Sequence, residues 1–112
     1  MSEIKDITDN LIKFRNDRDW KQFHDSKNLA TAISIEAAEL NELFLWKSIG
    51  DSEKVDPQKI KEELADILAF SFLLAEKHGF DVKEIMIDKI NKNNIKYPVD
   101  KAKGNARKYT DL

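Results

Sequence analysis

The chain has 112 residues, of which 41% are hydrophobic and 36% are charged, and its formal net charge is −2. This length fits one domain with a single core, and the balanced charge excludes a pronounced basic surface for a nucleic-acid polymer or an anionic membrane. The absence of cysteine excludes disulfides and thiolate metal sites. The N-terminus has no signal-peptide core and the longest apolar run, 67–75, is too short to span a membrane, so we expect a cytoplasmic protein.

The hydrophobic period is helical along most of the chain, and only three glycines and two prolines interrupt it. The pattern predicts a first helix over about 3–17, followed by a polar connector over 16–27. A second helix is expected from Ser26, a suitable N-cap, to about Trp46.

The second half of the chain predicts two more helices. Asp56-Pro57 supplies a cap and a proline at the first helical position, so a third helix is expected over about 57–77. A fourth is expected over about 82–96, beyond Gly79. The polar and basic residues 99–112 predict an extended tail.

Four helices with short loops indicate an all-α fold of the four-helix-bundle type. We expect residues 1–98 to form the helical domain, and the basic tail 99–112 to contribute to that same domain.

Two carboxylate pairs, Glu36-x-x-Glu39 and Glu63-x-x-Asp66, interrupt otherwise apolar helical segments. Residues three apart lie on nearly the same helix face, and Glu36 and Glu63 each fall on the apolar stripe of their helix. An unpaired carboxylate there costs several kcal/mol (roughly) or takes up a proton. A bound cation is the other remedy, and ligands that are all oxygen favour Mg²⁺ or Mn²⁺ over zinc.

Two structural alternatives compete with this metal site. Buried salt bridges would need basic partners, but segments 32–43 and 63–75 contain none. A di-iron bundle would need Glu-x-x-His, and neither His24 nor His78 lies three residues after a glutamate. We therefore prefer the metal site to both.

Aromatic residues lie near the expected ends of the first two helices, and basic residues gather near the C-terminus. Trp20, Phe23, His24 and Trp46 have polar neighbours, and aromatic faces beside a Mg²⁺ site suit a nucleobase. Taken singly, tryptophans are more often part of a core, and each basic residue is typical of a solvated surface. Together, the following residues have the charge to neutralise a triphosphate: Lys92, Lys96, Lys101, Lys103, Arg107 and Lys108.

On these residues the chain resembles the MazG-like all-α nucleoside triphosphate pyrophosphohydrolases. The signature of that family, ExxE followed by ExxD, is met by Glu36, Glu39, Glu63 and Asp66. More specific segments resemble the dCTP pyrophosphatase branch: RDWKQFHDSKNLA (18–30), EAAELNELFLWK (36–47), EELADILAF (62–70), NNIKYP (93–98) and RKYTDL (107–112).

The resemblance implies Mg²⁺-dependent hydrolysis of a deoxynucleoside triphosphate to the monophosphate and pyrophosphate, in order to clean the nucleotide pool. It implies dCTP or a modified dCTP as the preferred substrate. In the family the four acids hold the metal and one glutamate takes a proton from water, which here implies Glu36 or Glu39 as the catalytic base. It also implies a homodimer or a homotetramer.

The resemblance further implies which residues bind substrate. The base and sugar are expected to contact residues 20–24, Trp46 and Phe70. The phosphates are expected to bind near the C-terminal segment. The expected residues are Trp20, Lys21, Gln22, Phe23, His24, Trp46 and Phe70 for the nucleoside, and Asn93, Lys96, Lys108 and Tyr109 for the phosphates.

Phe70 departs from the family pattern, because dCTP-preferring relatives often have a tyrosine there. A missing hydroxyl lowers the discrimination between bases, so a dUTP or broad-specificity pyrophosphatase is an alternative. A second alternative, from a different class, is a helical interaction module whose acids bind a structural cation. Four converging acids together with two tryptophans favour the enzyme.

Overall fold

The computed structural model describes residues 2–112, which are helical with no strand among them, so the expected all-α fold is confirmed. The elements are α1 (Glu3–Asp17), the 3₁₀ turn η1 (Lys21–Phe23), α2 (Ser26–Glu42), α3 (Ile49–Ser52), α4 (Pro57–Lys77), α5 (Val82–Lys96), α6 (Val99–Ala102) and the 3₁₀ turn η2 (Tyr109–Asp111). None of the helices described is long and apolar enough to cross a membrane.

The chain forms two compact units, the first ending at Gly79 and the second comprising Phe80–Leu112. The first unit contains α1 to α4, and the second contains α5, α6 and η2. The domain organisation expected from the sequence, 1–98 with the tail 99–112, stays a prediction.

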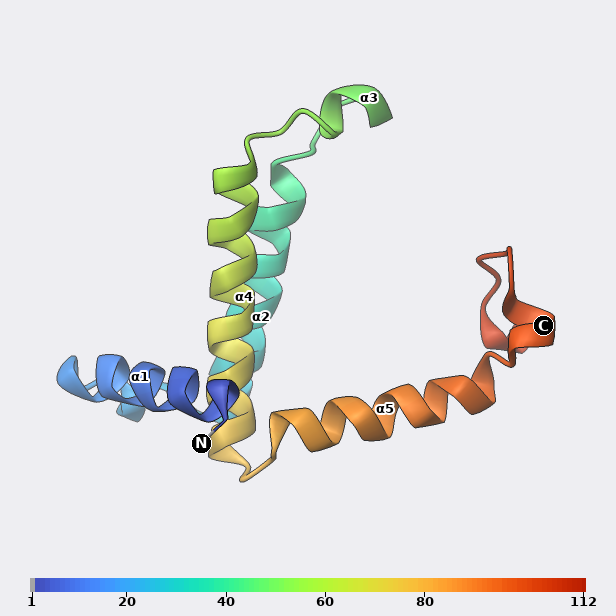
Figure 1. The fold of residues 1–112 in the computed structure, drawn as a ribbon. Coiled ribbons are helices and arrows are strands. Elements are labelled where there is room, and N and C mark those ends of the chain that lie inside the picture. Colours follow the sequence, from blue (N-terminus) through green and yellow to red (C-terminus); the bar gives the residue numbers. More distant parts are fainter. Residues whose placement is uncertain (1) are drawn as a thin grey trace. The chain divides into compact units, whose positions relative to one another are not determined.

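In the first unit, α2 and α4 lie side by side as an antiparallel pair, and α1 packs across α4 (Figure 1). Leu29 of α2 and Leu73 and Ala75 of α4 are buried. Burial of an aliphatic side chain such as leucine contributes about 1.5–3 kcal/mol, so these contacts hold the pair together. The antiparallel pair of α2 and α4 holds the acidic residues in position.

Three of the long helices begin and end where the sequence predicts. α1, α4 and α5 match the expected ranges. Asp56 Oδ1 caps α4 by accepting the N–H of Gln58 at 3.0 Å, and Asp81 Oδ1 caps α5 by accepting the N–H of Glu84 at 2.9 Å. Gly79 follows α4 with φ +69°, a left-handed conformation that side chains with a Cβ rarely adopt.

The expected start of α2 needs correction. Its N-cap is Asp25, whose Oδ1 accepts the N–H of Asn28 at 2.7 Å, and Ser26 is the first helical residue. A carboxylate is the stronger acceptor for a helix N-terminus. The hydroxyl of Ser26 instead lies 2.8 Å from Nε2 of His78, and so joins the start of α2 to the end of α4.

The expected end of α2 at Trp46 is also wrong, because the helix ends at Glu42. The N–H groups of the next three residues, 43–45, bond to carbonyls three residues back, in tight turns rather than α-helical ones. Trp46 then has φ +63°, a conformation that no helix contains. The indole is therefore presented from a turn.

The C-terminal tail is more ordered than the extended segment predicted. Pro98 accepts hydrogen bonds from the N–H groups of Lys101 and Ala102 and thereby starts α6. The rings of Tyr97 and Tyr109 meet edge-to-face with their centroids 6.0 Å apart. Short-range ring contacts thus fold the tail within the second unit.

Candidate active site

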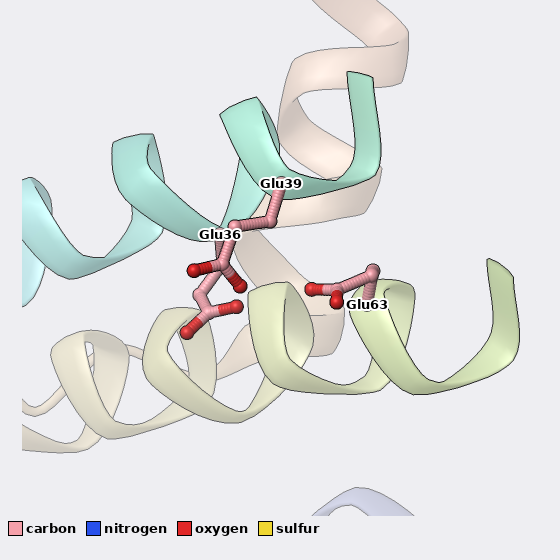
Figure 2. Close-up of side chains that lie close together, drawn as sticks. All are labelled: Glu36, Glu39 and Glu63. Carbon is pink, nitrogen blue, oxygen red and sulfur yellow. The ribbon is translucent and has the colours of Figure 1, made fainter. Parts of the chain in front are cut away.

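Three carboxylates converge between α2 and α4. Glu36 and Glu39 come from α2 and Glu63 comes from α4, and one oxygen of each lies within 4.8 Å of the others (Figure 2). Glu36 and Glu63 are half-buried, whereas Glu39 is exposed. The antiparallel pairing of α2 with α4 brings residues far apart in the sequence to one place.

Two oxygens in this cluster have no hydrogen-bond partner among residues 2–112. They are Oε2 of Glu36 and Oε2 of Glu63, and both are buried. Burial raises the pKa of Glu36 to about 7, with further contributions from the neighbouring acids, first among them Glu39. Burial, and next the charge of Glu39, also raises the pKa of Glu63. Glu36 and Glu63 therefore retain a proton more readily than ordinary glutamates, or require a cation.

The fourth predicted ligand, Asp66, lies outside this group of three, and it is exposed. Its charge nevertheless contributes to raising the pKa of both Glu36 and Glu63, so it is near the cluster. The ion pairs found within residues 2–112 involve other acids, which disfavours the salt-bridge alternative. The donor set that remains is entirely carboxylate oxygen.

A short loop between α1 and α2 carries the first group of predicted nucleoside contacts. Trp20, Lys21, Gln22 and Phe23 are exposed there. The amide nitrogen of Gln22 donates to the carbonyl oxygen of Asp19 at 2.9 Å and to its carboxylate at 3.1 Å. Gln22 is thus already engaged within the loop, whereas Phe23 is 59% exposed and Trp20, with Phe14 beside it, is 44% exposed.

His24 and Phe70, two residues predicted to contact the nucleoside, lie together in the structure. Their rings meet edge-to-face with centroids 6.2 Å apart. Nδ1 of His24 is buried without a hydrogen-bond partner, and burial lowers the pKa of the imidazole. Phe70 follows Glu63 by about two helical turns on the same face, or about 10 Å along α4. A neutral imidazole and an aromatic ring therefore lie along the helix face that carries the acids.

Trp46 does not join this group within one chain. α2 has 17 residues and so spans about 25 Å, with Trp20 before its start and Trp46 after its end. The side chain of Trp46 is 93% exposed, and Ile49 beside it is 87% exposed. A large exposed aromatic on a left-handed backbone is typical of a binding surface.

The residues predicted to contact the phosphates all lie in the second unit, and two of them contact each other there. Nζ of Lys96 lies 4.7 Å from the ring centroid of Tyr109, and Asn93 is half-buried on the same helix as Lys96. Lys108 is exposed at the start of η2. Their relation to the acids stays a prediction.

The structure also shows supporting residues that the sequence reasoning missed. Arg15 is buried, and its Nη1 lies 3.4 Å from Oε2 of Glu76. Phe14 meets Trp20 edge-to-face at 5.8 Å, and the guanidinium of Arg18 lies 3.7 Å from the Phe14 centroid. An arginine on a helix ordinarily indicates a solvated face, so the sequence held no signal for the burial of Arg15.

Proteins named dCTP pyrophosphatase 1 are similar in sequence to this chain along nearly its whole length. Mouse dCTP pyrophosphatase 1 is 40% identical, and human dCTP pyrophosphatase 1 is 35% identical; each match covers 97% of this chain and 67% of the relative. The crystal structure of a pyrophosphatase from Archaeoglobus fulgidus superposes with a TM-score of 0.83 at 35% identity, covering 88% of this chain and 94% of that one.

The model of the MazG-like family matches residues 31–112, a region that includes all four acids of the signature. The carboxylate cluster, the all-α fold and these similarities agree. The chain belongs to the MazG-like family.

Proposed function

We propose that this protein is a Mg²⁺-dependent nucleoside triphosphate pyrophosphohydrolase that converts dCTP, or a modified dCTP, to the monophosphate and pyrophosphate. The observation that carries the proposal is the convergence of Glu36, Glu39 and Glu63 with two buried, unpaired oxygens. The relatives named dCTP pyrophosphatase support the substrate class. Mn²⁺ is the expected substitute for Mg²⁺.

The residues present fit a hard divalent cation. Three carboxylates within 4.8 Å would hold it, with Asp66 close by, and the unpaired oxygens of Glu36 and Glu63 would gain a partner. When bound, such a cation supplies positive charge to the phosphate oxygens and acidifies water. All-oxygen ligation argues for Mg²⁺ rather than zinc.

Side chains of this protein supply the proton acceptor and the contacts to the nucleoside. One of Glu36 or Glu39 accepts a proton from the water whose oxygen attacks the α-phosphorus, while the bond to the β-phosphate oxygen breaks and pyrophosphate leaves. Trp20 offers a stacking face for the base, and His24 offers a buried ring nitrogen for a hydrogen bond. The exposed Lys21 and Phe23 flank the nucleoside in this arrangement.

A second copy of the chain completes the pocket in our proposal. Trp20 and Trp46 lie at opposite ends of α2, so one chain does not bring both indoles to one base. Leu64 and Leu68, one helical turn apart on α4, are large apolar side chains that are exposed. Burying such a surface against its symmetry mate is the usual basis of a homodimer, and two dimers make a homotetramer. Trp46 would then contribute its indole to the nucleoside site of the partner copy.

Release of pyrophosphate from each deoxynucleoside triphosphate, with and without Mg²⁺ or Mn²⁺, tests the enzymatic proposal. We expect turnover only with metal, and dCTP or a modified dCTP to have the highest kcat/KM. Turnover of dUTP above dCTP would refute the substrate assignment alone. If no nucleotide is hydrolysed, while Mg²⁺ still stabilises the fold, the helical interaction module is the better description.

Mixing two impaired variants tests whether Trp46 acts on the partner's site. Glu63→Gln removes a metal ligand and Trp46→Ala removes an indole, so a mixed dimer holds one site with both groups intact. At low substrate concentration, unfolding and refolding the mixture should recover about a quarter of wild-type activity if subunits pair at random. If the mixture has only the summed activity of the separate variants, Trp46 acts within its own chain or not at all.

A further inference from the structure

The loop that carries Trp20 and His24 is built on the C-terminal end of α1. The N–H groups of Arg18 and Trp20 both bond to the carbonyl oxygen of Arg15, at 3.2 and 3.1 Å. Nη1 of Arg18 bonds to the carbonyl oxygen of Phe14 at 3.0 Å. The path of the loop therefore depends on where the last turn of α1 is held.

The side chain of Arg15 holds that turn against α4. Its guanidinium is buried, with Nε donating to Oδ1 of Asn16 at 3.1 Å and Nη1 to Oε2 of Glu76 at 3.4 Å. Glu76 lies in the last turn of α4, and it is 37% exposed. This ion pair is thus a side-chain bond between the helix that starts the loop and the helix that carries Phe70.

Burying an arginine contributes little net stability to a folded protein, because the charged group must leave water. Removing a guanidinium from water costs several kcal/mol (roughly), and apolar residues of similar volume often stabilise a protein as well or better. What an ion pair adds is direction, because its hydrogen bonds are met in one orientation of α1 on α4 only.

The charge of Arg15 acts on His24, one of the residues proposed to bind the nucleoside. Burial lowers the pKa of this imidazole, and the positive charge of Arg15 lowers it further. Charged or titratable groups on the surrounding elements include Arg15 on α1, Lys21 on η1, Glu76 and His78 at the end of α4, and Asp25, whose carboxylate caps α2. Phe70, the ring neighbour of His24 on α4, carries no charge.

We propose that Arg15 is a positioning residue: its bond to Glu76 fixes the loop that bears Trp20 and His24 on α4 and so sets the geometry in which a base is bound. This inference rests on the proposed function, which places a nucleobase against that loop. The ionic partner of Arg15 is Glu76 and not one of the clustered carboxylates, so we expect it to affect binding of the nucleoside rather than the chemical step.

Kinetics of Arg15→Met, which keeps the aliphatic bulk, test the proposal. We expect KM for the nucleotide to rise about tenfold, with kcat within about twofold of wild type. Arg15→Lys, which retains the charge opposite Glu76, should recover most of the affinity. Lys13→Met on the same helix breaks an exposed ion pair with Asp17 and should leave both constants unchanged. An unchanged KM for Arg15→Met, or a loss confined to kcat, would overturn the proposal.

NMR titration of the His24 ring, without any nucleotide, separates this inference from the proposed function. Arg15→Met removes a positive charge, so the pKa of His24 should rise. Glu76→Met leaves Arg15 charged and without its partner, so the pKa of His24 should fall, although KM rises in both variants. If the pKa of His24 is the same in both, Arg15 does not act on the loop, whatever the enzyme hydrolyses.

Both measurements use protein whose helical content by circular dichroism matches wild type. Should Arg15→Met fail to fold, Glu76→Met breaks the same bond from the more exposed side and provides the same KM test. A wild-type KM for Glu76→Met would then refute the positioning role.

Discussion

Replacing Glu36 by glutamine removes the carboxylate whose burial among other acids is most costly. The pKa of Glu36 rises from its ordinary 4.5 to about 7 in the folded chain. At about 1.36 kcal/mol per pKa unit, the full cost of ionising it in the folded state is about 3.4 kcal/mol. Because Glu36 is only half-buried, solvent screens the neighbouring charges, and we discount this to about 1–2 kcal/mol.

The sign of the pH dependence follows from proton binding. Between pH 4.5 and about 7 the folded chain retains a proton that the unfolded chain has lost. The contribution of Glu36 to the stability of metal-free wild type should therefore be highest below pH 4.5, fall as the pH rises through this window, and level off above it. Glu36→Gln lacks this contribution and keeps that of Glu63, whose pKa is also raised.

Urea unfolding in a chelator, at one fixed protein concentration, measures the difference. At pH 8 we expect Glu36→Gln to be about 1–2 kcal/mol more stable than wild type, and at pH 4 the two should be equal. The matched control is Glu42→Gln, at the exposed end of the same helix, which should have no such effect. A Glu36→Gln variant no more stable than wild type at pH 8, or equally stabilised at pH 4, would refute the reasoning.

Adding metal should reverse the order of stability. Mg²⁺ at about 100 times its dissociation constant stabilises the folded state by about 2.7 kcal/mol, if it binds only that state. Wild type has the full set of carboxylates and should gain this stabilisation, whereas Glu36→Gln should gain much less. Equal gains in both proteins would mean that the cation binds elsewhere.

Three further predictions address the chemistry, the specificity and the fold. Glu63→Gln should lower kcat by at least about 100-fold while circular dichroism shows an unchanged helical fold; turnover near wild type would mean that the site is misplaced. Phe70→Tyr adds a hydroxyl beside His24, and should raise the ratio of kcat/KM for dCTP over dUTP; a constant ratio would remove residue 70 from base selection. Leu29→Ala should cost about 2–5 kcal/mol in urea unfolding, because Leu29 is buried between the helices, whereas a loss below 1 kcal/mol (about) would contradict its place in the core.

Much of the helical framework could be predicted from the sequence, because helix formation depends on neighbours along the chain. Caps such as Asp56 and breakers such as Gly79 act within a turn of their own position, and α1, α4 and α5 accordingly have the expected bounds. The end of α2 was mispredicted for a local reason, since the apolar period continues through residues 43–46 while the backbone tightens. Periodicity reports which face is apolar, not where α-helical hydrogen bonding stops.

The sequence by itself determined where the acids lie along their helices: Glu36 and Glu63 each fall on an apolar stripe, and Glu39 and Asp66 follow them by three positions. Only the tertiary structure decided which partners they have. The pairing of α2 with α4 brings Glu63 to Glu36 and Glu39, and the packing of α1 joins Arg15 to Glu76, 61 positions away. The length of α2 separates Trp20 from Trp46. Helical periodicity fixes the face a residue occupies, whereas contact between helices depends on how their side chains pack, which local spacing does not encode.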